Sequence, residues 1–333
     1  MTLHPPEHRQ YAHCESGVVT ALLKRQGLDL SEPMVFGITG GLTFAYIPFI
    51  KITGMPIISY RMYPGAIIKG AVKHLDTRFR TQRYRDKEEA LAELISLVDS
   101  GEMVGLQTSV YWLPYFPPEM RFQFNAHNLI VYGREGNEFL VSDPVFDHPV
   151  RIGAEDLQNA RFARGSLAPK GFIYYPVRVN RDIDLAKAIR KALKRTVHMM
   201  LYAPVPFIGV KGIHYMARKI ERLPARGDMR YARLLLAHIV RMQEEIGTGG
   251  GGFRFMYAAF LQEAGELLGS APLGEASQMM TEAGNLWRQF ALASARACKN
   301  KTTDPDLGEI VQRLRTCAVQ EQLVYKTIKS LNL

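Results

Sequence analysis

Cys14 stands immediately before an apolar, helix-like run in the sequence YAHCESGVVTALL. A thiol at a helix N-terminus lies near the positive end of the helix dipole, which favours the thiolate form. The first N–H groups of such a helix can also stabilise an oxyanion on a carbonyl under attack. Cys14 is therefore a candidate nucleophile, with a small buried apolar residue as the alternative interpretation.

A nucleophilic thiol needs a base, and His127 is the best candidate in the sequence. It begins the strand-like run HNLIVYG, which the turn REGN separates from the second run, EFLVSDP. If the two runs pair as a hairpin, opposing residue numbers add up to about 270 or 271, which places His127 opposite Asp143. A carboxylate there would hold the imidazole in one tautomer. Taken singly, each residue is also explained as a strand-end histidine or an Asp-Pro turn residue.

The two halves of the chain differ in the secondary structure that their sequence patterns predict. The first half mixes helical and strand-like patterns, whereas the second half has helical periodicity almost throughout, interrupted by the glycine-rich stretch GTGGGG. We therefore predict an α+β domain over residues 1–179 and an all-α domain over 180–333. In the first domain, helices are expected over 15–27 and 85–101, and strands over 103–112, 127–133, 138–144 and 171–177.

Composition supports a two-domain globular protein. The chain has 333 residues, 47% of them hydrophobic and 22% charged, at roughly 100–200 residues per domain. Its three scattered cysteines form neither a disulfide framework nor a zinc pattern, which favours a reducing, cytoplasmic location. Residues 1–20 lack the apolar core of a signal peptide, and glycines and prolines interrupt the apolar run 35–58, so we expect no transmembrane span.

The net charge of +10 is concentrated in one window. Residues 178–241 contain 15 Lys and Arg against 4 Asp and Glu, an excess of 11. No helix-turn-helix, RNA-binding or zinc-finger pattern accompanies this charge, so we expect no nucleic-acid partner. A basic face of this kind is either solvated or suited to docking a small acidic protein.

The N-terminal half resembles the butirosin biosynthesis protein H family. The resemblance rests on His13-Cys14, Leu30-Ser31-Glu32, Phe36-Gly37 and Gly40-Gly41, together with the motifs WLPY and AHNLIVYG. The C-terminal half is similar to the domain that accompanies it, chiefly in GTGGGGFRFMYAAFLQEA.

This resemblance implies a papain-like fold related to C39-type peptidases and used for acyl transfer. It implies that Cys14 is the nucleophile, His127 the base and Asp143 the orienting acid. Papain-like proteases place an oxyanion-hole glutamine at a set spacing upstream of the cysteine. Gln10 is assigned that role, although fewer residues separate it from Cys14 than in the protease pattern. The implied donor is an acyl carrier protein or another acyl thioester.

Other residues are secondary candidates. Substrate contacts are assigned to Gly40, Gly41, Trp112, Tyr115 and Arg254. The alternative for the glycines is tight backbone packing, for the two aromatic residues a place in the core, and for Arg254 a solvated position at a helix start. Neither GITGGL nor GTGGGG has the residue pattern of a phosphate-binding loop. A metal site at His4, His8 and His13 is disfavoured because Pro5 and Pro6 prevent helical spacing. No metal or cofactor is expected.

The predicted function is therefore a cysteine-dependent acyltransferase. It would move an acyl group from a thioester through acyl-Cys14 to an amine or hydroxyl of a small molecule, in the biosynthesis of a lipid or secondary metabolite. A C39-like peptidase or amidase would use the same three residues with water as acceptor. A non-catalytic binding module with a buried Cys14 is the third possibility. The oligomeric state does not follow from the sequence.

Overall fold

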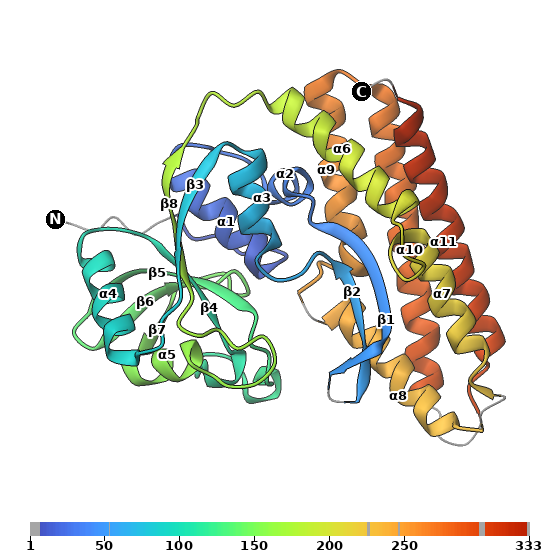
Figure 1. The fold of residues 1–333 in the computed structure, drawn as a ribbon, viewed down its shortest axis with the longest axis horizontal. Coiled ribbons are helices and arrows are strands. Elements are labelled where there is room, and N and C mark those ends of the chain that lie inside the picture. Colours follow the sequence, from blue (N-terminus) through green and yellow to red (C-terminus); the bar gives the residue numbers. More distant parts are fainter. Residues whose placement is uncertain (1–6, 53, 225–226, 246, 300–303, 332–333) are drawn as a thin grey trace. The chain divides into compact units, whose positions relative to one another are not determined.

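The computed structural model describes residues 7–52, 54–224, 227–245, 247–299 and 304–331 (Figure 1). The chain divides into two compact units, each built from two segments. Unit 1 comprises Met1–Val35 and Ile67–Ile183, and unit 2 comprises Phe36–Ala66 and Asp184–Leu333. Each unit is described below by itself.

Unit 1 contains a six-stranded antiparallel sheet in the order β3-β8-β4-β5-β6-β7. Its strands are β3 (Thr77–Gln82), β4 (Val104–Thr108), β5 (His127–Glu135), β6 (Glu138–Ser142), β7 (Val150–Gly153) and β8 (Ile173–Val179). Its helices are α1 (Cys14–Arg25), α3 (Ala66–His74), α4 (Lys87–Asp99) and α5 (Ala154–Arg161), with 3-10 turns at Val110–Trp112 and Pro118–Met120.

Alternating side chains give this sheet two buried faces. Leu106, Leu129 and Ile173 belong to one apolar core with residues of α4 and α5. Helix α1 contacts β4, β5 and β8, and residues of the opposite parity, such as Gly105 and Tyr174, pack against each other. Because successive residues of a strand point to opposite faces, α4 and α5 cover one face and α1 the other.

The predicted hairpin forms, but its register differs from the expected one. Ile130 pairs with Ser142 and Glu135 with Glu138, so opposing numbers add up to 272 and then 273 rather than 270 or 271. A bulge between Val131 and Gly133 accounts for the change along the hairpin. The prediction was therefore wrong by about two residues, because a sequence does not show where a turn closes or a bulge inserts.

Unit 2 is mainly helical. It contains α6 (Leu185–Tyr202), α7 (Gly209–Glu221), α8 (Met229–Val240), α9 (Arg254–Leu268), α10 (Ala271–Lys299) and α11 (Leu307–Ser330). A π-helical turn at Arg241–Glu245 and a 3-10 turn at Gly251–Phe253 precede α9. The helical prediction for this half is confirmed, since each of the six periodic runs forms a helix.

Unit 2 also includes a β-hairpin from the N-terminal half of the sequence. The strands β1 (Leu42–Ile52) and β2 (Met55–Arg61) pair antiparallel and contact α6, α7 and α8. Phe44 and Tyr60 of this hairpin pack on the Trp287 ring of α10, with centroids 5.7 and 5.3 Å away. Helix α2 (Glu32–Thr39) contains the point where the chain leaves unit 1.

The compact units differ from the two sequential segments that we predicted. The later boundary lies at 183/184, close to the predicted 179/180, but residues 36–66 group with the helices of unit 2. Local sequence patterns cannot reveal this assignment, because the partners of the apolar hairpin lie more than 110 residues further along the chain, from Asp184 onward. Within the described part of the chain, no helix combines the length and apolarity needed to cross a membrane.

Candidate active site

Cys14 is the first residue of α1, as its sequence context indicated. His13 is the N-cap residue, with an extended backbone, and its Nδ1 accepts a hydrogen bond from the Ser16 N–H at 3.2 Å. Gly17, one turn into the helix, packs so closely on Tyr11 that a Cβ atom would come within 2.5 Å of the Tyr11 Cβ. The segment before Cys14 is therefore held against the first turn of the helix.

A buried carboxylate fixes the turn that leads into Cys14. The Glu32 oxygens accept hydrogen bonds from the backbone N–H of Ala12 at 2.8 Å, that of His13 at 2.9 Å and the Ser16 hydroxyl at 2.7 Å. Burial raises the pKa of Glu32 and outweighs these three donors, which lower it. The sequence analysis noted Glu32 only as part of the motif Leu30-Ser31-Glu32. No feature of the neighbouring residues indicated that Glu32 positions the segment before Cys14.

His127 and Asp143 form a buried hydrogen-bonded pair, with 2.7 Å between Nε2 and Oδ2. His127 begins β5, and Asp143 directly follows the last residue of β6. The Asp143 carboxylate also accepts hydrogen bonds from the Tyr115 hydroxyl at 2.9 Å and from the Val145 N–H at 3.0 Å. The Phe116 ring and the His127 imidazole pack at a right angle, with ring centroids 5.5 Å apart. The structure thus brings the two predicted residues together despite the shifted register.

The electrostatic environment favours the protonated form of His127. Burial lowers the pKa of His127, but the charge and hydrogen bond of Asp143 and a hydrogen bond with the Cys14 side chain outweigh it and raise the pKa to about 10. A protonated imidazole beside the sulfur stabilises the thiolate form of Cys14. The pair can therefore supply both a nucleophile and a proton donor.

Asn128 is a further polar residue beside the Cys14 sulfur, and the sequence analysis did not predict it. Its Nδ2 lies 3.8 Å from the Cys14 Sγ and 3.1 Å from the Ala126 carbonyl oxygen. The Tyr174 hydroxyl donates to Asn128 Oδ1 at 2.9 Å and so orients the amide with its N–H groups toward Cys14. The only signal in the sequence was the position of Asn128 directly after His127 in the motif AHNL.

The secondary candidates in unit 1 have other described contacts. Gln10 is exposed, and its amide donates to the Val145 carbonyl at 2.8 Å, beside the loop that carries Asp143. Tyr115 supports Asp143 as described above. Trp112 is 41% exposed and packs edge-to-face on Tyr111, with centroids 5.3 Å apart, so it is no core residue.

The remaining candidates lie in unit 2. Gly40 has a φ of 76°, and Gly41 packs so tightly that a Cβ atom would lie 2.5 Å from the Phe36 ring. Arg254 is fully buried and forms an ion pair with Glu321, so neither the substrate contact assigned to it nor the alternative of a solvated helix-start arginine agrees with its position. The described residues include no cluster of three or more metal-ligating side chains. His4, named above among possible ligands, lies outside the described residues.

These features define a class: an α+β domain with a Cys-His-Asp site, followed by a helical region. Two family models match the chain. The model described as butirosin biosynthesis protein H, N-terminal, matches residues 13–144, and the one described as domain of unknown function DUF4872 matches residues 155–328, more than half of the chain. The chain therefore belongs to the family described by the DUF4872 model, and its N-terminal half is a domain of the butirosin biosynthesis protein H type.

Comparison with solved structures includes a candidate C39-like peptidase from Bacillus anthracis. It is 16% identical, with a TM-score of 0.38, over 53% of this chain and 96% of that chain. A search of curated proteins finds no match.

Proposed function

We propose that this protein is a cysteine-dependent acyltransferase, with Cys14 as nucleophile, His127 as acid and base, and Asp143 as the orienting group. The observation that carries the proposal is the buried His127–Asp143 hydrogen bond of 2.7 Å beside a thiol at the start of a helix. A description that names a biosynthetic protein, rather than a protease, favours transfer over hydrolysis.

In the first half-reaction, the Cys14 thiolate attacks the carbonyl carbon of an acyl thioester. The helix-start N–H groups of α1 and the Asn128 amide are the donors available for the oxyanion. When the intermediate collapses, the carbon–sulfur bond to the donor breaks, and His127 gives its proton to the departing thiolate. The acyl group is then a thioester on Cys14, and His127 is neutral.

In the second half-reaction, neutral His127 takes a proton from an amine or hydroxyl of the acceptor as it attacks acyl-Cys14. The new amide or ester leaves, and the Cys14 thiolate and protonated His127 are restored. Exchange between thioesters and aminolysis of a thioester need no metal and no nucleotide. The donor in this proposal is an acyl carrier protein or another acyl thioester, and the excess of Lys and Arg in residues 178–241 suits an acidic carrier.

The test is intact-protein mass spectrometry after brief incubation with a panel of acyl thioesters. The wild-type protein should gain the mass of one acyl group, and added amines should remove it and appear as amides. The Cys14→Ala variant should gain nothing. Cys298→Ser is the matched control, since Cys298 is also partly exposed but donates to the Arg233 carbonyl in unit 2, and this variant should be acylated normally.

Three results would contradict the proposal. Normal acylation and transfer by Cys14→Ala would exclude the thiol mechanism. Acylation followed by loss to water, with no amide formed from any amine, would indicate the hydrolase alternative. Failure of both acyl thioesters and iodoacetamide to modify Cys14 in the folded protein would indicate a non-catalytic module.

A further inference from the structure

Unit 1 contains a polar pocket that none of the residues of the proposed acyl transfer lines. Its volume is about 400 Å³, and its lining comes from the start of α4, the turn at Val110–Trp112, the segment before β5 and the end of α5. All of these lining residues belong to the described part of the chain. The volume lies in the range of roughly 300–1,000 Å³ that is typical of small-molecule pockets.

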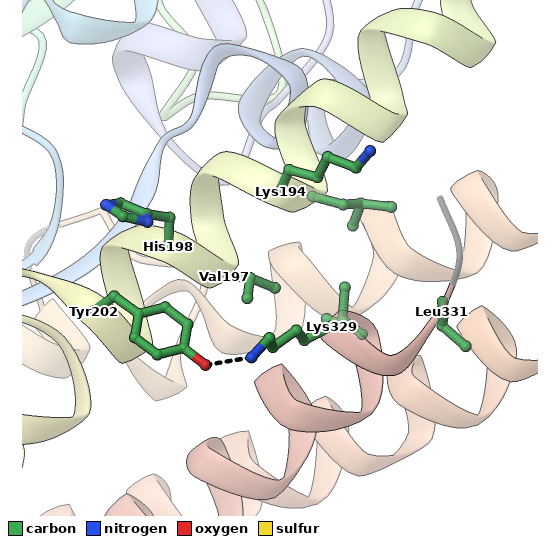
Figure 2. Close-up of a pocket in the computed structure, with 8 residues that line it drawn as sticks. Lys194, Val197, His198, Tyr202, Lys329 and Leu331 are labelled. Atoms are coloured by element: carbon green, nitrogen blue, oxygen red, sulfur yellow. Dashed lines mark hydrogen bonds between the residues drawn. The ribbon is translucent and has the colours of Figure 1, made fainter.

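The pocket between α6 and α11 in unit 2 differs from it in having committed polar groups (Figure 2). That pocket measures about 270 Å³, and its Lys329 ammonium group already donates to the Tyr202 hydroxyl at 2.7 Å. Figure 2 also shows that Lys194 points away from Lys329. Its polar side chains therefore do not converge on one ligand, and the unit 1 pocket is the better candidate for a binding site.

Two buried side chains of the unit 1 pocket have unused hydrogen-bonding groups. Ser109 is 1% exposed, and its hydroxyl does not cap the turn at Val110–Trp112 that it precedes. Asn125 is 6% exposed, and its Nδ2 donates to the carbonyl oxygens of Arg164 and Ser166, at 3.0 Å each. These two bonds fix the orientation of the amide. Within the described residues, the Ser109 hydroxyl and Asn125 Oδ1 have no hydrogen-bond partner.

These two groups are held by neighbouring chain segments. The Val110 N–H donates to the Phe124 carbonyl at 3.1 Å, just beyond the last pair of the β4–β5 ladder, so the residues Ser109 and Asn125 lie side by side. The pocket thus presents a hydroxyl, which can donate, next to an amide oxygen, which can only accept. Adenine carries the matching pair on one edge, since its N6 amine donates and the adjacent ring nitrogen accepts.

Trp112 supplies a flat apolar surface at the same pocket. Its indole lines the pocket and is partly exposed, and it packs at a right angle on the Tyr111 ring, with centroids 5.3 Å apart. This contact restricts the orientation of the indole. An exposed indole is a platform on which a nucleobase can stack, and such stacking contributes a large part of the affinity for a base.

The exposed side of the pocket is basic. Lys87 and Arg164 are exposed lining residues, and the Lys87 Nζ lies 5.9 Å from the centre of the Phe162 ring. The described lining residues include no Asp or Glu, and the neighbouring Asp86 accepts the Glu89 N–H at 2.8 Å as the cap of α4. A diphosphate has two charged groups, so each cation can contact a different phosphoryl group and the two need not converge.

We propose that this pocket binds the adenosine diphosphate moiety of a nucleotide. The base would stack on Trp112, its N6 amine would donate to Asn125 Oδ1, and its ring nitrogen would accept from Ser109. Guanine fits less well, because no carboxylate lines the pocket to accept its two adjacent donors. The moiety has two sources, a free nucleotide or coenzyme A. The coenzyme A source rests on the proposed function, in which its thioester would be the acyl donor.

Tryptophan fluorescence tests the site directly. The chain has two tryptophans, Trp112 and Trp287, and Trp287 is fully buried in unit 2. ADP should quench part of the fluorescence in a saturable way, and this quenching should be absent in Trp112→Phe. Isothermal titration calorimetry then gives the affinity. Inosine diphosphate, which places an oxygen where adenine has its amine, should bind about tenfold more weakly than ADP.

Variants locate the ligand. Trp112→Ala should weaken ADP binding about tenfold through lost stacking. Ser109→Ala should weaken it about fivefold and leave the far-ultraviolet circular dichroism unchanged, because the hydroxyl has no partner within the described residues. Tyr202→Ala is the matched control, since Tyr202 is an exposed aromatic residue that does not line this pocket, and its affinity should stay within about twofold of wild type.

The ligand series identifies the source and can overturn the proposal. Coenzyme A that binds at least as tightly as ADP identifies coenzyme A, and tighter binding of ADP identifies a free nucleotide; both results support the site. Equal affinity for ADP and inosine diphosphate, an equal loss in Trp112→Ala and Tyr202→Ala, or no quenching at millimolar ADP would each overturn it.

The failure of this inference is distinguishable from the failure of the proposed function. Cys14→Ala should bind ADP as tightly as wild type does. A protein that binds ADP but is not acylated by any thioester would contradict only the acyltransferase. A protein that is acylated at Cys14 by an N-acetylcysteamine thioester, but does not bind ADP, would contradict only the nucleotide site.

Discussion

The described residues of each unit include a buried ion pair, and these two pairs have different surroundings. His127 and Asp143 in unit 1 are 2.7 Å apart, and Arg254 and Glu321 in unit 2 are 2.9 Å apart. All four side chains are at most 5% exposed. The first pair adjoins a partly exposed thiol, whereas the second is enclosed on every side.

The enclosure of the second pair is complete. Glu321 also accepts hydrogen bonds from the Trp287 Nε1–H and the Tyr325 hydroxyl, and Arg254 also donates to the Gly252 carbonyl. The guanidinium lies within 5.5 Å of the Tyr60 and Trp287 ring centres.

The contrast teaches what makes a buried charge pair reactive. A guanidinium stays protonated under all ordinary conditions, so Arg254 can only hold the glycine-rich turn and three helices together. An imidazole can exchange a proton, and one side of His127 adjoins Cys14, where the proton can be used. Desolvation strengthens both pairs, but only the first is coupled to an atom that can react.

The largest expected effect comes from removing the charge of Asp143 while keeping its shape. In Asp143→Asn, the Val145 N–H would hold the amide oxygen at the position of Oδ1, and the amide nitrogen would take the position of Oδ2 and face His127 Nε2. The imidazole would then have to accept at Nε2, which is the wrong tautomer for a base. The rate of acyl transfer should fall by about 10³–10⁴-fold. Single-turnover acylation of Cys14 measures this, and a loss below tenfold would contradict the role of Asp143.

The corresponding change in unit 2 should affect stability instead of rate. Glu321→Gln leaves the Arg254 charge buried and unpaired, which costs about 3–5 kcal/mol of unfolding free energy. Urea denaturation measures the loss. The matched control is Glu309→Gln, which removes an exposed pair with Arg313 and should cost no more than about 0.5 kcal/mol. Acylation per folded molecule should be unchanged in both variants, and a large rate loss in Glu321→Gln would dissolve the distinction between the two pairs.

How far the sequence predicts these two regions depends on the range of the contacts involved. The position of Cys14 at the start of a helix is a local feature, and the sequence pattern predicted this position correctly. The approach of His127 to Asp143 was predicted through a register that was wrong, because the contact runs diagonally beyond the end of β6 and tolerates a shift of two residues.

Non-local contacts were not predictable from the sequence. Arg254 looked like a surface residue because its partner lies 67 positions further along the chain. The contacts of Glu32, of Asn128 and of the segment 36–66 likewise involve residues that are not their neighbours in the sequence. A periodic pattern shows that a helix has an apolar face, but it does not show which charged side chain is covered by that face.

Asn128 provides a way to sharpen the assignment of oxyanion donors. Asn128→Ala removes the Nδ2 donor that lies 3.8 Å from the sulfur, and the acylation rate should fall by about 10²-fold. Gln10→Ala serves as the comparison, because the Gln10 amide donates to the Val145 carbonyl. Its acylation rate should fall less than fivefold. The reverse ranking, measured with the same thioester, would transfer the oxyanion role to Gln10.

The pH dependence of stability offers a smaller and independent effect. The pKa of His127 is raised from 6.5 to about 10 by Asp143 and Cys14, against the opposing effect of burial. The stabilisation from this proton is therefore fully present below pH 6.5 and is lost as the pH rises toward 10. In Asp143→Asn, burial still lowers the pKa of His127, and the Asp143 charge that raised this pKa is gone. The difference in unfolding free energy between wild type and variant should shrink between pH 6.5 and 10, whereas a constant difference would show that His127 is not held as the cation.

The smallest effect should come from the outermost residue that supports the His127–Asp143 pair. Tyr115→Phe removes the hydroxyl that donates to Asp143 Oδ2, the same oxygen that His127 contacts, but the Val145 N–H still holds Oδ1. The carboxylate keeps its charge and one of its two other donors, so acylation should slow only about tenfold, with no change in which residue is acylated. Tyr111→Phe, at an exposed tyrosine outside this network, should leave the rate unchanged. A loss in Tyr115→Phe as large as that in Asp143→Asn would mean that the phenol, rather than the carboxylate charge, sets the orientation of His127.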